Sequence, residues 1–297
     1  MKTAGERFLS RRDFLAVTAA AAMAGVGSAR AATSPRVATL DWAILETLLA
    51  LGANVVAGTE LRQFHEVAVT PEVPASVADL GLRGTPNFEV LRYAKPDLIF
   101  NSNFYAWADP RMQDIAPVES HSVYMPGESP YHLSERMTFA IGDRLGLGSA
   151  RTLVDGLHAK LEAYRGQFAK GDHRPILPIN LGDSRHFRVF GSNSMFGEVL
   201  ARTGLTNAWP DVTSYSATAP VGIERLAAMP EAWIVLIPPH PAEAYAELQA
   251  SAFWKALPPV RDGRVLLLGS INPYGALPAA ERFADLLAGG LTHAWNG

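Results

Sequence analysis

Residues 87–101 read NFEVLRYAKPDLIFN, and this stretch indicates how the chain folds. Asn87–Ala94 has the spacing of a short helix, and Lys95-Pro96 ends it. Asp97–Asn101 then forms an apolar run of the length of a buried strand. Helix, proline turn and buried strand in this order are typical of α/β folds.

A second copy of this pattern occurs in the other half of the chain. Ile223-Glu224-Arg225-Leu226 corresponds to the helix, Met229-Pro230-Glu231 to the turn, and an apolar strand follows. Two similar lobes joined by one long helix would explain the repeat. Helix–proline–strand turns are also common in any α/β chain, so the repeat alone does not decide between one large domain and two lobes.

Strands and helices alternate along the rest of the chain. The other expected strands are Arg36–Leu40, Asn54–Gly58, Pro175–Asn180, Phe187–Phe190, Trp233–Pro238 and Arg264–Leu268. The other expected helices are Trp42–Leu51, Met195–Arg202, Ile223–Met229, Ala279–Leu287 and a long stretch, Leu133–Lys170, interrupted near Gly146–Gly148. This alternation predicts α/β lobes with largely parallel sheets.

The N-terminus has the features of a twin-arginine export signal. Arg11-Arg12 precedes a short apolar run, and Ala29-Arg30-Ala31 places small residues at the −3 and −1 positions of a cleavage site. We therefore expect residues 1–31 to be a signal peptide and the mature protein to be periplasmic. The alternative is an ordinary N-terminal helix with a chance arginine pair.

The composition excludes several classes of protein. The chain contains no cysteine, which argues against a lipid anchor, disulfides and thiol catalysis. Loss of residues 1–31 would remove five basic and two acidic residues, so the formal charge would change from −3 to −6. A mildly acidic chain is a poor candidate for binding nucleic acid.

The usual enzyme motifs are missing from the sequence. No Gly-x-Gly-x-x-Gly opens a helix, and neither a P-loop nor a Gly-x-Ser-x-Gly elbow is present. The eight histidines never occur as His-x-His or as His-Glu-x-x-His. We therefore expect no catalytic residues and no metal ligands, although scattered histidines could still form a metal site.

Polar and aromatic residues near the ends of the expected elements are the candidates for a binding site. Arg83 lies on a glycine-flanked loop, and Phe104-Tyr105 directly follow a strand, where open α/β sheets bind ligands. Tyr215 and Tyr274 lie on loops of the second half. Each aromatic alone could be loop packing, but together they indicate a cleft with few charges.

Several short pieces, in this order and together with the export signal, carry a resemblance to a known family. They are Asp41-Trp42, Glu46–Gly52, Asp79–Arg83, Pro86–Leu91, Lys95-Pro96-Asp97, Ile115-Ala116-Pro117, Val189–Ser194, Ile223–Ala227 and Tyr274-Gly275-Ala276. Over residues 36–290 the chain resembles the periplasmic ferric-hydroxamate siderophore-binding proteins, which are class III substrate-binding proteins of ABC importers.

The resemblance implies an α/β fold of two Rossmann-like lobes joined by a long connecting helix. The expected boundaries are residues 32–148 for the N-terminal lobe, 149–171 for the helix and 172–297 for the C-terminal lobe. It also implies that Arg83 and Tyr105 contact the hydroxamate oxygens around ferric iron, with Phe104 as a competitor of Tyr105. The other ligand-binding residues that it implies are Tyr215, Thr218, Asn272 and Tyr274.

The resemblance also implies the partners. The ligand is a ferric hydroxamate, and because its iron arrives already chelated, no cofactor and no protein metal ligand is expected. The second partner is an inner-membrane ABC permease, which would be contacted by Glu89 and Glu198, and the protein is expected to be a monomer. Glutamate in a first helical turn is also favoured by the helix dipole alone.

Alternatives remain within and outside this class. The tryptophans of the family's pocket are not obvious here, since Tyr215 or Ser216 stands at one such place and Asn272 or Pro273 at another. Another iron chelate, haem or a corrinoid could therefore be the ligand. A strongly anionic catecholate complex should require several arginines, of which only Arg83 is evident. The alternative of another class is an exported α/β enzyme.

Overall fold

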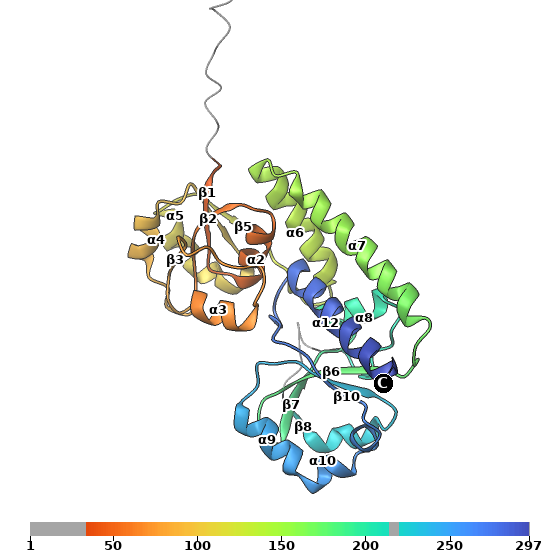
Figure 1. Ribbon diagram of the computed structural model, residues 1–297. Coiled ribbons are helices and arrows are strands. Elements are labelled where there is room, and N and C mark those ends of the chain that lie inside the picture. The colour runs from red at the N-terminus through yellow and green to blue at the C-terminus, as the bar shows by residue number, and fades with distance from the viewer. Residues whose placement is uncertain (1–33, 214–219, 297) are drawn as a thin grey trace, which may run out of the picture. The chain divides into compact units, whose positions relative to one another are not determined.

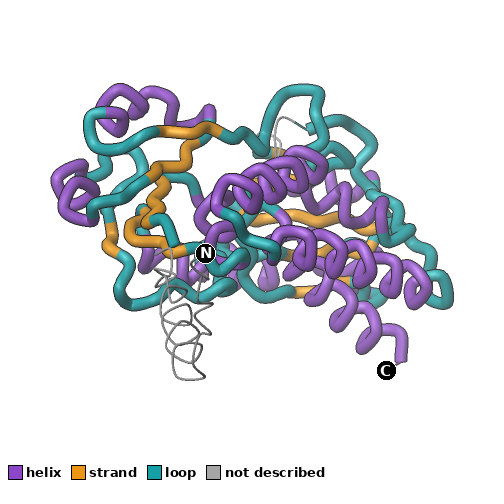
Figure 2. The backbone as a smooth tube through the Cα atoms, turned by 90° about the horizontal axis from the view of Figure 1, so that it is seen from above, coloured by secondary structure: helices purple, strands orange, loops and turns teal. Residues whose placement is uncertain are grey.

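The computed structural model describes residues 34–213 and 220–296, and residues 35–297 form one compact unit. This unit contains two five-stranded sheets, with strand orders β3-β2-β1-β4-β5 and β10-β9-β6-β7-β8 (Figure 1). We call the sheet of β1 to β5, with the helices that follow its strands, the N-terminal lobe. The sheet of β6 to β10, with its helices, is the C-terminal lobe. Figure 2 shows the loops that connect strands to helices in both lobes.

The N-terminal sheet is parallel throughout. Its strands are β1 (Arg36–Thr39), β2 (Asn54–Gly58), β3 (Ala78–Asp79), β4 (Leu98–Asn101) and β5 (Val118–Ser120). The strand order reverses between β1 and β4, as in doubly wound sheets. Each pair of consecutive strands is connected through a helix, which allows the strands to run parallel. The carboxyl ends of all these strands therefore lie at one edge.

Short helices make the connections of the N-terminal lobe. They are α2 (Trp42–Ala50), α3 (Leu61–Val67), α4 (Phe88–Ala94), the 3₁₀ helix η1 (Asn103–Ala108) and α5 (Asp109–Gln113). Asp41 and Asn87 accept hydrogen bonds from the first turns of α2 and α4, which fixes where these helices begin. The two helices predicted here from the sequence are confirmed to within one residue at each end.

Two long helices, α6 (Pro130–Leu145) and α7 (Ser149–Phe168), follow the N-terminal sheet and precede the C-terminal sheet in the sequence. They pack side by side in the fold. Gly146, with φ 68°, ends α6 in the left-handed conformation that glycine favours. A Cβ on Gly142 would lie 2.5 Å from the Cβ of Ala150, so the close packing of the two helices requires glycine there. The predicted interruption near Gly146–Gly148 is confirmed, whereas the expected lobe boundaries stay a prediction.

The C-terminal sheet is mixed rather than parallel. Its strands are β6 (Ile176–Leu181), β7 (His186–Val189), β8 (Val221–Gly222), β9 (Trp233–Leu236) and β10 (Val265–Leu267). β6, β9 and β10 pair in parallel, but β7 is antiparallel to both β6 and β8. The expectation of a largely parallel sheet is wrong for this edge, because only residues 182–185 separate β6 from β7 and so short a connection forms a hairpin.

The helices of the C-terminal lobe are partly those expected. They are α8 (Met195–Arg202), the 3₁₀ helix η2 (Ile223–Ala228), α9 (Ala242–Ala250), α10 (Ala252–Ala256), α11 (Pro258–Arg261) and α12 (Leu277–Asn296). α12 continues well past the predicted Ala279–Leu287. Its buried residues Phe283, Leu287 and Leu291 keep the helical spacing through Gly289-Gly290, so packing outweighs the low helix propensity of glycine.

The main hydrophobic core combines residues from both lobes. Leu45 and Leu48 of α2, Phe196 of α8, and Phe283 and Leu287 of α12 belong to the same cluster of buried side chains. Phe196 and Phe283 stack with ring centroids 4.5 Å apart. Two smaller clusters cover the other face of each sheet. No helix of the described residues is long and apolar enough to cross a bilayer.

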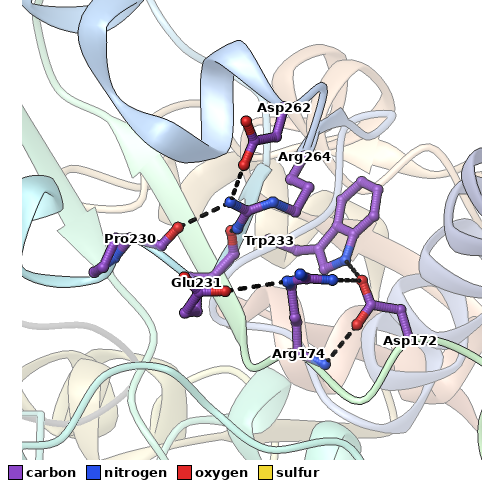
Figure 3. A network of polar contacts seen from close by, with 8 residues as sticks. Asp172, Arg174, Pro230, Glu231, Trp233, Asp262 and Arg264 are labelled. Atoms are coloured by element: carbon purple, nitrogen blue, oxygen red, sulfur yellow. Dashed lines mark hydrogen bonds and ion pairs between the residues drawn. The ribbon is translucent and has the colours of Figure 1, made fainter.

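A polar network closes the C-terminal sheet where β9 begins (Figure 3). Arg264 is 6% exposed and donates to the carbonyl oxygens of Ala232 at 3.0 Å and Pro230 at 2.9 Å. It also pairs with Asp262 at 2.6 Å. Nearby, Arg174 bridges two acids, Asp172 and Glu231, on the protein surface.

Candidate functional site

The candidate site lies at the carboxyl edge of the N-terminal sheet. The loops after β1, β2, β3 and β4 carry Asp41 and Trp42, then Glu60, then Arg83, and finally Phe104 and Tyr105. A cavity of about 470 Å³ opens there and is lined by Asp41, Trp42, Arg83, Phe104, Tyr105 and Tyr274. This is the edge at which open α/β sheets bind ligands.

Arg83 is held in a defined position within this cavity. Its guanidinium carbon lies 4.0 Å from the centroid of the Trp42 ring. Its Nε donates to Glu60 Oε2 at 2.7 Å, and its backbone N donates to Glu60 Oε1 at 3.1 Å. Glu60 occupies Nε, and Arg83 also forms a hydrogen bond with Tyr105, so the remaining terminal N–H groups are the donors left for other acceptors.

Trp42, on which Arg83 lies, is itself fixed. Its Nε1 donates to the carbonyl oxygen of Thr59 at 2.9 Å. Phe64 of α3 meets its ring edge to face, with centroids 5.4 Å apart. Trp42 is 5% exposed, so it forms a rigid floor under the guanidinium rather than a mobile wall.

Asp41 contributes a buried carboxylate beside Arg83. Its Oδ1 accepts from the backbone N of Ala43 at 2.7 Å, and its Oδ2 accepts from Ser102 Oγ at 2.6 Å. Burial raises the pKa of Asp41, while these hydrogen bonds and the charge of Arg83 act in the opposite direction. The carboxylate therefore serves first to begin α2 and to attach the loop after β4.

Tyr105 faces Arg83 from the loop after β4. Burial raises the pKa of its phenol to about 12, and the charge of Asp41 contributes, whereas Arg83 lowers it through its charge and a hydrogen bond. The phenol is therefore neutral and can donate near physiological pH. Asn101 Nδ2 donates to the carbonyl oxygen of Tyr105 at 3.0 Å and holds this loop against the end of β4.

Aromatic rings complete the cavity wall. Phe104 is 42% exposed and lies 6.5 Å from Tyr124 between ring centroids. Tyr124 in turn meets Tyr274 at 6.2 Å and donates its hydroxyl to the carbonyl oxygen of Gly275. Tyr105 and Phe104 both line the cavity, and which of these neighbours contacts the ligand stays open.

Asn272 lies behind the cavity and does not line it. It is 2% exposed, its Nδ2 donates to Glu46 Oε2 at 3.2 Å, and its Oδ1 accepts from the backbone N of Tyr274 at 3.2 Å. Its contacts are those of a residue that positions the loop of Tyr274. The expected ligand contact of Asn272 stays a prediction that this burial does not favour.

Glu46 is a residue of this region that the sequence analysis did not single out. It is fully buried in α2 and accepts from the backbone N of Ala276, where α12 begins. Burial raises its pKa to about 8, against the effect of its hydrogen bonds to Ala276 and Asn272. Its signal in the sequence is an acid within the otherwise apolar run Trp42–Leu51.

The remaining predicted residues lie elsewhere. Tyr215 and Thr218 lie outside the described residues. Glu89 is exposed in the first turn of α4. Glu198, in the first turn of α8, is 18% exposed, lies 3.8 Å from Arg202 and lines a second cavity of about 570 Å³. The structure thus brings Arg83, Tyr105 and Tyr274 together, but not the two glutamates.

The chemistry of the cavity is that of a receptor for a neutral or weakly polar ligand with acceptor oxygens. One guanidinium and one neutral phenol supply donors, and tryptophan, phenylalanine and tyrosine rings supply apolar surface. In residues 34–213 and 220–296, no group of three His, Asp or Glu side chains is arranged to hold a metal ion.

Comparisons with known proteins agree with this geometry. A family model described as periplasmic binding protein matches residues 37–271. The iron(3+)-hydroxamate-binding protein FhuD of Escherichia coli (strain K12) is 30% identical over 287 residues, which cover 95% of this chain and 97% of that protein. This family consists of binding proteins, which agrees with the expectation of binding without turnover.

Solved structures show the same fold at lower identity. The siderophore-binding protein FhuD from Vibrio cholerae, bound to Fe³⁺–Desferal, has a TM-score of 0.83 at 23% identity, covering 87% of this chain and 98% of that chain. FhuD2 from Staphylococcus aureus with bound ferrioxamine B has a TM-score of 0.70 at 18% identity, covering 88% and 99%. The predicted fold class is confirmed, and the chain belongs to the periplasmic binding protein family as a relative of the iron(3+)-hydroxamate-binding proteins.

Proposed function

We propose that this protein captures a ferric hydroxamate siderophore and delivers it to an ABC importer. The observation that carries the proposal is the placement of Arg83, whose guanidinium lies over the Trp42 ring beside a neutral Tyr105 in a mostly aromatic cavity. The Escherichia coli relative, an iron(3+)-hydroxamate-binding protein at 30% identity, supports the same ligand class.

The ligand's chemistry fits these donors. A ferric trihydroxamate core is close to neutral, but its oxygens carry partial negative charge. Arg83 and Tyr105 donate to these oxygens, and Phe104 and Tyr274 contact the apolar surface of the ligand. The protein then needs no iron ligand of its own, because the hydroxamates already fill the coordination sphere.

Export and delivery belong to the same proposal. Residues 1–31 act as a twin-arginine signal that directs the mature protein to the periplasm. The mature protein acts there as a monomer. An inner-membrane permease then contacts the protein through Glu89 and Glu198. Glu89 is exposed and suits this role, whereas Glu198 is largely covered and lies beside Arg202. Glu224 occupies the place of Glu89 in the repeated sequence pattern and is exposed, so it is the competing candidate.

Titration of the mature protein tests the ligand class. Tryptophan fluorescence should be quenched by a ferric trihydroxamate with one-to-one stoichiometry, and the complex should be recovered unchanged. The iron-free siderophore, a ferric catecholate, haem and a corrinoid serve as competitors. Tighter binding of any of these would replace the hydroxamate in the proposal, and chemical conversion of the ligand would favour the exported-enzyme alternative.

Uptake in cells tests the docking residues. Glu89→Ala, Glu198→Ala and Glu224→Ala are compared singly and in pairs that change one acid in each lobe. Docking predicts unchanged ligand affinity with impaired uptake, because separated carboxylates orient a rigid receptor on a basic surface. Normal uptake by the Glu89→Ala, Glu198→Ala pair together with impaired uptake by the Glu89→Ala, Glu224→Ala pair would assign the role to Glu224.

A further inference from the structure

Arg83 is bound by one acid in two places. Glu60 Oε2 accepts from the Nε of Arg83 at 2.7 Å, and Glu60 Oε1 accepts from its backbone N at 3.1 Å. The carboxylate is only 13% exposed. One side chain therefore fixes both the backbone and the guanidinium of Arg83. It binds the guanidinium through Nε and not through the terminal nitrogens.

The backbone of Glu60 is adapted to this contact. Its φ of 50° and ψ of 43° lie in the left-handed region, which costs free energy for any residue with a Cβ. Its backbone N donates to the carbonyl oxygen of Gly81 at 3.0 Å, and Asp79 accepts from the backbone N of both Leu61 and Gly81. The loops after β2 and β3 are thus joined so that Glu60 reaches Arg83.

Two carboxyl groups lie close to the positive charge of Arg83. Glu60 offsets the positive charge of Arg83 at direct hydrogen-bond distance, and the buried Asp41 carboxyl lines the same cavity. Trp42, Phe104, Tyr105 and Tyr274 add no charge near neutral pH. A ligand with a net negative charge would therefore meet no uncompensated cation among the lining residues, while a ligand with an added ammonium group would meet two carboxyl groups close by.

We infer that Glu60 is a positioning residue that holds Arg83 for the hydroxamate oxygens and sets the charge preference of the site. The cavity then selects neutral or cationic ferric hydroxamates over those that carry a carboxylate. This inference rests on the proposed function and adds to it the class of hydroxamate.

Three ligands and three proteins test this role. The ligands share a ferric trihydroxamate core and are neutral, ammonium-bearing (ferrioxamine B) or carboxylate-bearing. The proteins are the native chain, Glu60→Gln, which keeps an acceptor oxygen and loses the charge, and Glu66→Gln, which removes an exposed acid of α3 as a matched control. Affinities are measured by tryptophan quenching, and folding is checked by thermal melting.

The native protein should bind the neutral and ammonium-bearing complexes more tightly than the carboxylate-bearing one. Glu60→Gln should shift the ratio of the affinities for the ammonium-bearing and the carboxylate-bearing complexes by about tenfold in favour of the carboxylate-bearing complex, because it removes a close negative charge. Glu66→Gln should leave the ratio unchanged. A purely structural Glu60 would lower all three affinities together.

The outcomes separate the two proposals. If the native protein binds none of the three complexes, the proposed function is overturned and this inference with it. Binding with an unchanged ratio in Glu60→Gln, or with the same shift in Glu66→Gln, overturns the inference alone. If Glu60→Gln does not fold, tightest binding of the carboxylate-bearing complex by the native protein still overturns it.

Discussion

Two arginines at opposite ends of strands show how the same side chain serves binding in one place and stability in another. Arg264, near the start of β10, is 6% exposed, and its bonds to Ala232, Pro230 and Asp262 all stay within the fold (Figure 3). Arg83, beyond the end of β3, is bound through Nε alone to one acid and faces a cavity. A guanidinium whose two terminal nitrogens are both bonded within the fold is structural, and one whose terminal nitrogens face a cavity can bind a ligand.

The acids of the two regions differ in their burial. Asp262 is half exposed beside Arg264, so water shares in its solvation. Glu46 lies fully buried behind the binding cavity, and its hydrogen-bond partners Asn272 and Ala276 carry no charge. The binding region therefore contains a carboxyl group whose ionisation is opposed by burial.

The largest effect is expected from the pH dependence of Glu46. Its pKa is about 8 in the folded protein against 4.5 ordinarily, so between these values the folded state binds a proton that the unfolded state lacks. The free energy of unfolding should therefore fall as the pH rises from about 4.5 to 8, by on the order of a few kcal/mol. Glu46→Gln should remove this slope.

Urea unfolding of both proteins from pH 5 to pH 9 measures this difference. The stability of Glu46→Gln relative to the native protein should increase from pH 5 to about pH 8 and level off above pH 8. Equal slopes for the two proteins would show that Glu46 is ionised without penalty in the fold.

Arg264→Ala should destabilise the protein by about 2–3 kcal/mol, because it removes the donors to the buried carbonyl oxygen of Ala232 and to the carbonyl oxygen of Pro230. Ligand affinity should stay unchanged once the variant is folded. Arg174→Ala, whose side chain is 45% exposed in the same network, is the control and should cost less. Equal losses for the two variants would remove the contrast between buried and exposed members of this network.

Arg83→Ala should show the opposite profile. Affinity for a ferric trihydroxamate should fall by about 1.5–3 kcal/mol, since a charge-assisted hydrogen bond to the ligand is lost. Stability should change little, because the terminal nitrogens face a cavity rather than the core. Arg62→Ala, an exposed arginine of α3, is the matched control for lost positive charge. A large loss of stability without a loss of affinity would show that Arg83, like Arg264, has a structural role and does not bind the ligand.

Tyr105→Phe should have the smallest effect, about 0.5–1.5 kcal/mol of affinity, because it removes one neutral donor and keeps the ring. Tyr93→Phe, at an exposed tyrosine of α4, provides the comparison. If Tyr105→Phe is silent while Phe104→Ala weakens binding, the loop after β4 contributes its ring and not its hydroxyl.

The sequence predicted those parts of the site that depend on local order along the chain. Tyr105 directly follows an expected strand, so the rule that ligands bind at the carboxyl ends of parallel strands was enough to select it. Arg83 was selected from its glycine-flanked loop, since the strand before it, β3, was not among those expected. The fold class followed from the same alternation and from the family resemblance.

The supporting residues could not be selected in this way. Glu60 meets Arg83 across 23 positions of the sequence, and Glu46 meets Asn272 across 226. Such contacts depend on how loops and lobes pack, which no periodicity records. The same reason explains the antiparallel β7, where a short connection decided the direction, and α12, where packing carries the helix through two glycines.

The position of iron in a complex tests the central claim most directly. Crystals of the mature protein with a ferric trihydroxamate would show the metal by its anomalous scattering. We expect the iron in the cavity of Arg83 and Tyr105, with hydroxamate oxygens accepting from the guanidinium and the phenol and with no protein atom bound to the metal. Iron in the second cavity beside Glu198, or coordinated directly by a protein side chain, would contradict the account.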